Sequence, residues 1–219
     1  IKQTFIDGVA KNLANYIHKI KDEFLNLSKL EKANLFSEQW IKYLQDNDTK
    51  AILIAYRAYL DFYKGHFDKA LEIVNNAEKI IEKKDSLEYA EILTYQGRLN
   101  KELGELEKAL SLFKQSFEMR KRLYNNEDHL EIADSLTNLG SMWITKNFDK
   151  ALSFFEQSLE ITNRLFIGQD NPRIANSLNS LGYIWHNKDF NKALAFFKQS
   201  FEMRKRLFQN HDHPDVSNS

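Results

Sequence analysis

The sequence contains no cysteine, only two prolines and only seven glycines among its 219 residues. Without cysteine there is no disulfide framework, so a reducing compartment, the cytoplasm, is the expected location. Few helix breakers, together with 28% charged and 42% hydrophobic residues, indicate a soluble and nearly all-helical chain.

The chain also lacks an excess of either charge, because 31 basic residues are balanced by 31 acidic residues. This balance argues against a nucleic-acid-binding protein and against a polybasic membrane-binding surface. No apolar run approaches the roughly 18 residues needed to span a bilayer, and the N-terminus does not have the pattern of a signal peptide. We therefore expect no membrane insertion.

What the sequence does contain is an internal repeat. Gly140 recurs 42 residues later as Gly182, and Trp143 recurs at the same distance as Trp185. The segment FKQSFEMRKRL at residues 113–123 returns unchanged at residues 197–207, two periods later. A fixed period between 20 and 50 residues indicates a stacked array of repeats.

From residue 50 onward, apolar spacings of three and four residues predict pairs of helices. The first two pairs comprise residues 51–63 with 67–83 and residues 87–103 with 106–124. Gly65 and Gly104 suit left-handed turn positions, and Asn147 is the next best residue in a later turn that lacks glycine. The predicted repeats span residues 50–84, 86–126, 129–168 and 171–210, followed by an incomplete repeat start.

Residues 1–47 do not share the repeat pattern. We expect them to form a helical pair packed on the first repeat, with Ser28 and Glu31 in a capping box. Asp46 to Thr49 should end this pair and cap the next helix. Because the chain starts without methionine and stops inside a new repeat start, we expect it to be part of a larger protein.

Small residues recur midway along each first helix, at Gly97, Gly140 and Gly182. Small groups allow two helix axes to approach closely, with large side chains filling the space beside them. The residues predicted to be buried in this way are Leu136, Leu139, Trp143, Phe155, Leu178, Leu181 and Trp185.

The segments L-G-x-x-W at residues 139–143 and 181–185, and F-x-K-A-L at residues 148–152 and 190–194, carry a resemblance to the tetratricopeptide repeat family. The 42-residue period and linkers such as residues 168–172 are most similar to the kinesin light chain subgroup. The resemblance covers residue 50 to the end. It implies an all-α, right-handed superhelical solenoid of antiparallel helix pairs.

The resemblance also implies that first helices line a concave groove that binds a peptide or a partner helix. The groove wall would change from aromatic to basic to amide-rich along the chain. An alternative for the aromatic part is that Tyr56, Tyr59 and Tyr63 are buried by the N-terminal helices. The residues expected to contact a partner are Tyr59, Tyr95, Arg98, Asn138, Ser141, Asn179, Tyr183 and His186.

Other kinds of site are not favoured. The two MRKRL segments are explained by favourable helical ion pairs, such as Glu118 with Arg122, on a solvated face. His211 and His213 have no third ligand nearby, so a metal site is not expected. No phosphate loop, nucleophile elbow or other catalytic motif is present, so we expect neither a cofactor nor enzymatic activity.

The sequence thus indicates a protein-interaction module or scaffold. One alternative is a peptide-regulated phosphatase or regulator of the Rap type, in which Gln39 and Asp46 would be the candidate actors. Another is the sensor region of a multidomain effector. We also expect Phe197 and Phe201 to lack cover at the end of the array, so that this end self-associates.

Overall fold

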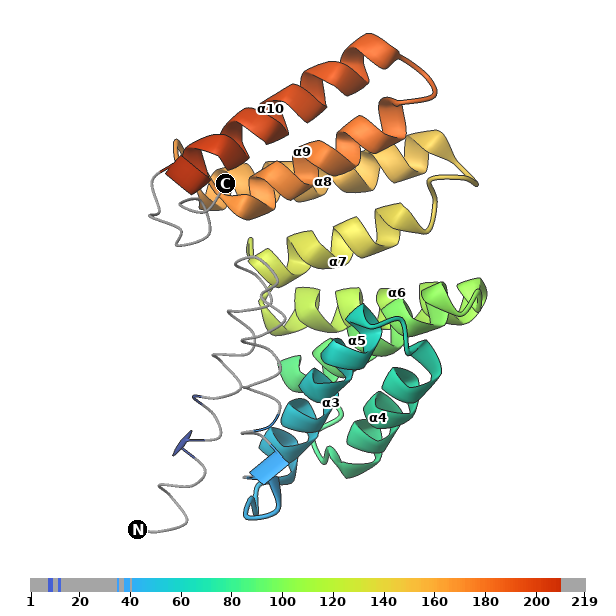
Figure 1. The fold of residues 1–219 in the computed structure, drawn as a ribbon, viewed down its shortest axis with the longest axis vertical. Helices are drawn as coiled ribbons and strands as arrows, with labels where there is room; N and C mark the ends of the chain where they lie inside the picture. Colours follow the sequence, from blue (N-terminus) through green and yellow to red (C-terminus); the bar gives the residue numbers. More distant parts are fainter. Residues whose placement is uncertain (1–7, 10–11, 13–34, 36–37, 40, 210–219) are drawn as a thin grey trace. The chain divides into compact units, whose positions relative to one another are not determined.

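A computed structural model of the chain describes residues 8–9, 12, 35, 38–39 and 41–209. From Asn47 to Gln209 it forms eight helices, labelled α3 to α10, and no strand, which confirms the predicted all-α fold (Figure 1). Most of the predicted N-terminal helical pair, including the Ser28–Glu31 capping box, lies outside the described residues.

The chain divides into two compact units, which are described separately. The first unit ends at Leu123 and contains two antiparallel helix pairs. Helices α3 and α5 pack against each other, and α4 also contacts α5. The pairs are α3 (Asn47–Tyr63) with α4 (Phe67–Ile80), and α5 (Leu87–Glu102) with α6 (Leu106–Leu123).

The second unit begins at Tyr124 and again contains two helix pairs. Helix α8 packs against α7 on one side and against α9 on the other, so the two pairs form one layered core. The pairs are α7 (Leu130–Ser141) with α8 (Phe148–Leu165), and α9 (Pro172–Trp185) with α10 (Phe190–Gln209).

Most of the predicted helix ends are confirmed by their capping residues. Asp46 caps α3 by accepting a hydrogen bond from the Thr49 backbone N–H at 3.0 Å. Pro172 begins α9, where its missing amide costs nothing. Gly65 and Gly104 adopt left-handed φ angles of 77° and 83°, as the turns require.

The role predicted for Asn147 was wrong. Its φ angle is −156°, so the residue is extended rather than left-handed. Asn147 instead caps α8, because its side chain accepts a hydrogen bond from the Lys150 backbone N–H at 2.9 Å. The side chain of Asp189 accepts the equivalent bond from Lys192 at 3.1 Å. In these shorter turns a polar side chain accepts a hydrogen bond from a free backbone N–H at the start of the next helix. No left-handed residue is needed.

Within each of the last three pairs, the same two contacts hold the second helix against the first. The first contact is a phenylalanine ring that lies against the glycine backbone, as Phe155 does at Gly140. The second is a serine hydroxyl that donates to an alanine carbonyl across the pair. These bonds are Ser116 to Ala90 at 2.7 Å, Ser158 to Ala133 at 2.8 Å and Ser200 to Ala175 at 2.7 Å.

The predicted core is largely confirmed, with one correction at the tryptophans. Leu136, Leu139, Phe155, Leu178 and Leu181 are buried. Trp143 and Trp185, which were expected to be buried, are only half-buried. Their outer faces are covered by ammonium groups: Lys150 Nζ lies 3.7 Å from the Trp143 ring centroid and Lys192 Nζ lies 4.2 Å from the Trp185 centroid. Each tryptophan is therefore an edge residue of the core.

Candidate functional site

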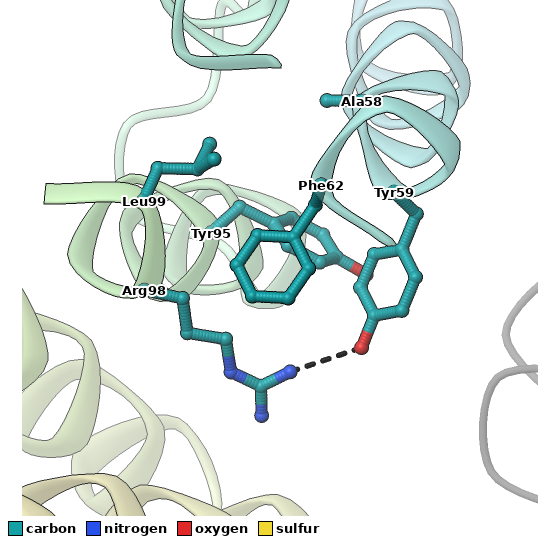
Figure 2. A pocket seen from close by; sticks show the side chains of 6 residues that line it. All are labelled: Ala58, Tyr59, Phe62, Tyr95, Arg98 and Leu99. Atoms are coloured by element: carbon teal, nitrogen blue, oxygen red, sulfur yellow. Dashed lines mark hydrogen bonds between the residues drawn. The ribbon is translucent and has the colours of Figure 1, made fainter. Parts of the chain in front are cut away.

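The first unit contains an aromatic pocket between α3 and α5 (Figure 2). In Figure 2 the rings of Tyr59, Phe62 and Tyr95 gather at its centre, and Arg98 reaches in from α5 toward the Tyr59 hydroxyl. The cavity volume is about 10 Å³, which is space for about one water molecule. Its full lining is Ala58, Tyr59, Phe62, Tyr95, Arg98 and Leu99.

Two of the predicted groove residues serve as the wall of this pocket rather than as an exposed surface. Tyr59 and Tyr95 are only 6% and 4% exposed, and their rings meet edge to face at a centroid distance of 5.2 Å. Burial raises the pKa of Tyr95 well above its usual value, with the nearby carboxylate of Glu91 as the next cause. Tyr95 is therefore a neutral aromatic packing group at physiological pH.

Arg98 provides the cationic rim of the pocket. Its Nη1 donates a hydrogen bond of 3.0 Å to the Tyr59 hydroxyl, which fixes the guanidinium beside the aromatic rings. The side chain is half-buried. A guanidinium beside aromatic rings suits a planar anionic group or an aromatic side chain of a ligand. Among the contact residues predicted in the first unit, Arg98 is the one that reaches solvent.

The second unit carries the predicted amide and hydroxyl groups. Asn138 and Ser141 lie on α7, where the Ser141 hydroxyl donates to the Asn138 carbonyl at 2.7 Å. Asn138 Nδ2 is buried and has no hydrogen-bond partner among the described residues. Such a donor is costly to leave unsatisfied, by roughly 1–3 kcal/mol. Asn179, which is half-buried, lies on α9.

Tyr183 and His186 lie at the C-terminal end of α9 and are both exposed. The Tyr183 ring contacts the Phe197 ring edge to face at a centroid distance of 5.3 Å. His186 Nδ1 lies 3.0 Å from the side-chain oxygen of its neighbour Asn187. The predicted residues thus form two groups: three in the first unit and five in the second.

The basic segments of α6, α8 and α10 form ion pairs with linker residues that were not predicted from the sequence. Arg164 pairs with Glu160, four residues earlier on the same helix, at 2.5 Å. It also binds Asp128 in the preceding linker with two hydrogen bonds, at 2.5 Å and 2.9 Å. Arg206 holds Asp170 in the same way, at 2.7 Å and 2.8 Å.

Arg122 binds Asp85 in the first unit in the same way, and not Glu118, so the ion pair predicted between Glu118 and Arg122 was wrong. The signal for these pairs was present in the sequence, since an aspartate lies two residues before the start of each of the last three first helices. In each pair the hydrogen bonds from the arginine lower the pKa of the aspartate below its ordinary value of 3.8. These arginines tie each second helix to its own linker and are engaged within the repeat.

Two residues, Gln39 and Asp46, were considered for a Rap-type activity. Gln39 is exposed. Asp46 is engaged as the N-cap of α3, and its hydrogen bond from the Thr49 side chain, ahead of the cost of burial, lowers its pKa. Among the described residues, no group of three or more histidine, aspartate or glutamate side chains is placed to hold a metal ion. His211 and His213 lie outside the described residues.

None of the helices in the described part of the chain is both long enough and apolar enough to cross a membrane.

Several solved structures are similar to this chain. BtubC (BKLC) from P. vanneervenii shares 25% sequence identity, with a TM-score of 0.67 over 85% of this chain and 77% of that one. A putative kinesin light chain from Podosopora anserina, with nearly identical repeats, is 13% identical, with a TM-score of 0.62 over 91% and 96% of the two chains. The apo form of RapI is 22% identical, with a TM-score of 0.59 over 87% and 52%.

No curated protein sequence gives a significant match to this chain. The family model described as "Tetratricopeptide repeat" matches residues 48–122, 103–164 and 141–206, which together cover most of the chain. These matches span the same helix pairs that the Gly–Phe and Ser–Ala contacts hold together. The chain therefore belongs to the tetratricopeptide repeat family.

Proposed function

We propose that this chain is a non-enzymatic protein-interaction scaffold that binds a peptide or a partner helix through its first helices. The repeat family supports a role in protein interaction. The observation that carries the peptide-binding proposal is the buried amide group of Asn138, whose Nδ2 has no partner among the described residues. An amide side chain can donate to a peptide carbonyl and accept from a peptide N–H, which suits backbone recognition.

The two groups of candidate residues fit different parts of a ligand. Asn138, Ser141 and Asn179 suit the polar backbone of an extended peptide. Arg98, beside Tyr59, suits an acidic or aromatic side chain. Because the cavity of the aromatic pocket has the volume of about one water molecule, the ligand side chain would contact its rim rather than fill it.

The proposal is tested with peptides selected from a displayed random library against the whole chain. The selected peptides should lose at least about tenfold in affinity for a variant with alanine at Arg98, Asn138, Asn179 and Tyr183. A matched control replaces three exposed residues of the second helices, Lys114, Lys121 and Glu156, by alanine. Peptides that bind the groove variant and the wild type equally well would place the site elsewhere on the chain.

Self-association through α10, which the sequence predicted, is a candidate because this helix exposes Phe190, Leu194 and Phe201, but Lys198 and Lys205 beside them oppose it. The measurement is the mass of the chain in solution by light scattering. A monomer at micromolar concentrations contradicts this candidate.

A further inference from the structure

The outer face of α10 is an exposed apolar stripe. Phe190, Leu194 and Phe201 are 65%, 53% and 63% exposed, and Phe197 between them is half-buried. The four side chains are spaced by four, three and four residues, which places them on one side of the helix. Spacing of this kind is what one helix presents to another.

The same surface occurs on α8, and there a helix covers it. Phe148, Leu152, Phe155 and Leu159 hold the same positions one repeat earlier, and none of them is exposed. Helix α9 lies over them with Leu181, Ile184 and Trp185 in a single cluster. The Trp185 ring meets Phe148 edge to face at a centroid distance of 5.0 Å. The α8–α9 contact therefore shows what kind of helix the stripe on α10 accepts: one with leucine, isoleucine and tryptophan on one side.

The charges at the C-terminal end of the stripe specify the partner further. In the earlier repeat, the covering helix brings a cation, because Arg173 of α9 forms an ion pair with Asp134 of α7. In the last repeat Asn176 stands in place of Asp134, and Arg204 stands in place of Thr162. Arg204 donates to Asn176 Oδ1 at 2.7 Å, and no carboxylate of the described residues pairs with it. A helix that covers α10 would therefore meet the guanidinium of Arg204 at the position where α9 meets the carboxylate of Asp134.

The charges beside the stripe on α10 also argue against a second copy of this chain as the partner. Lys198 and Lys205 are exposed and follow Leu194 and Phe201 by one helical turn, so they border the stripe. Two α10 helices packed antiparallel around Phe197 and Phe201 would bring their Lys198 ammonium groups together, which is repulsive. Lys198 and Lys205 instead favour a partner with acidic side chains beside its apolar face.

We propose that the outer face of α10 binds an amphipathic helix of a partner protein. That helix carries the apolar pattern of α9 and brings a carboxylate in its first turn to Arg204. A carboxylate in the first turn is also favoured by the dipole of the helix that carries it. This interaction is separate from ligand binding by Asn138 and the other first-helix residues.

The test compares two synthetic peptides with the sequence of residues 171–187, one native and one carrying Arg173→Asp. Each is labelled at its N-terminus and titrated with the whole chain in a fluorescence anisotropy assay. The Asp peptide should bind about fivefold more tightly than the native peptide at low salt, and the difference should shrink as salt is added. The chain with Arg204→Glu should reverse this order of affinity, and the chain with Phe201→Asp should bind neither peptide.

Two control variants separate this site from the rest of the chain. Lys114→Glu makes a similar change of charge on α6, and Asn138→Ala removes a groove amide. Both variants should bind the two peptides with the same affinities, and in the same order, as the unmodified chain. Equal binding of the two peptides, or an order that Arg204→Glu does not reverse, would overturn the proposal. A dimer of the chain that Phe201→Asp dissociates would also overturn it, since the occupant would then be a second copy.

Discussion

At the scale of single residues, the repeat is set by positions where only a small group fits. A Cβ atom added at Gly97 would lie 2.6 Å from Cε1 of Phe113, and one added at Gly182 would lie 2.5 Å from Cε1 of Phe197. At Gly140 the nearest atom, Phe155 Cε1, is 3.0 Å away. The phenylalanine ring occupies the space that any other side chain would need, so the glycine and the phenylalanine are one packing unit.

The first prediction is that Gly97→Ala destabilises the chain and does so more than Gly140→Ala. Alanine gains about 1 kcal/mol of helix propensity over glycine, whereas overpacking against buried Phe113 costs about 1–3 kcal/mol. The net loss should appear as a lower urea midpoint for Gly97→Ala. Because the contact at Gly140 is looser, Gly140→Ala should shift the midpoint less. A Gly97→Ala chain that is more stable than the wild type would show that the ring moves freely, and adding Phe113→Leu should then have no rescuing effect.

The second prediction concerns the linker aspartates Asp85, Asp128 and Asp170. Their pKa values are lowered in the folded chain by hydrogen bonds from arginine. A lowered pKa means that the pairs stabilise the fold above the unfolded value of 3.8, and that this contribution is lost as the pH falls through the lower folded values. The melting temperature should therefore drop between about pH 5 and about pH 3.

The control is a chain with asparagine at all three aspartates. It should melt at a lower temperature than the wild type at neutral pH, and the gap should narrow as the pH falls below about 4. Because the pairs are exposed, the gap should also narrow at high salt. A gap that stays constant between about pH 5 and about pH 3 would rule out the charged form of these carboxylates as its cause.

At the scale of the helices, the fold could be predicted well from the sequence, because several repeats show the same spacing of apolar and small residues. The helix pairs, the Gly65 and Gly104 turns and the capping by Asp46 all appear as predicted. The two failures have physical reasons. Asn147 was assigned by its tolerance of left-handed angles, whereas its side chain serves as a helix cap. Trp143 was assigned by its size, whereas a lysine on the following helix covers its outer face.

The third prediction compares a fully buried core residue, Phe155, with a half-buried one, Trp143. Phe155 is 2% exposed, so Phe155→Ala should lower the free energy of unfolding by about 3–5 kcal/mol. Trp143→Ala should cost less than this, because the tryptophan is half-buried. Lys150→Met keeps the aliphatic stem but removes the ammonium group, and should cost about 0.5–1 kcal/mol. Chemical denaturation of the three variants gives the order, and a larger loss for Trp143→Ala than for Phe155→Ala would contradict it.

At the scale of the whole molecule, the sequence predicted the candidate site less completely than the fold. It placed Tyr59 and Tyr95 on a groove wall, but it could not show that they would pack against each other in a cavity of about 10 Å³. The periodicity of a first helix shows which residues share a side, whereas burial depends on neighbouring helices. The sequence also placed Asn138 on the groove wall, which stays a prediction, and the amide nitrogen of this residue has no hydrogen-bond partner among the described residues.

The last prediction follows from the balance of charge over the whole chain. The sequence pI is about 7.2 and the net charge is zero with neutral histidines, so self-repulsion is weakest near neutral pH. Precipitation by polyethylene glycol should therefore be easiest near pH 7. Below and above that pH the net charge departs from zero, so solubility should rise in both directions.

A charge variant tests this reasoning on the same fold. Replacing the exposed residues Lys198 and Lys205 by glutamate lowers the net charge by four, so the chain becomes neutral only at a lower pH. The solubility minimum should then move to a lower pH than that of the wild type. If the minimum stays near neutral pH in the variant, apolar surface such as the Phe190–Phe201 stripe of α10, rather than net charge, controls the solubility of this protein.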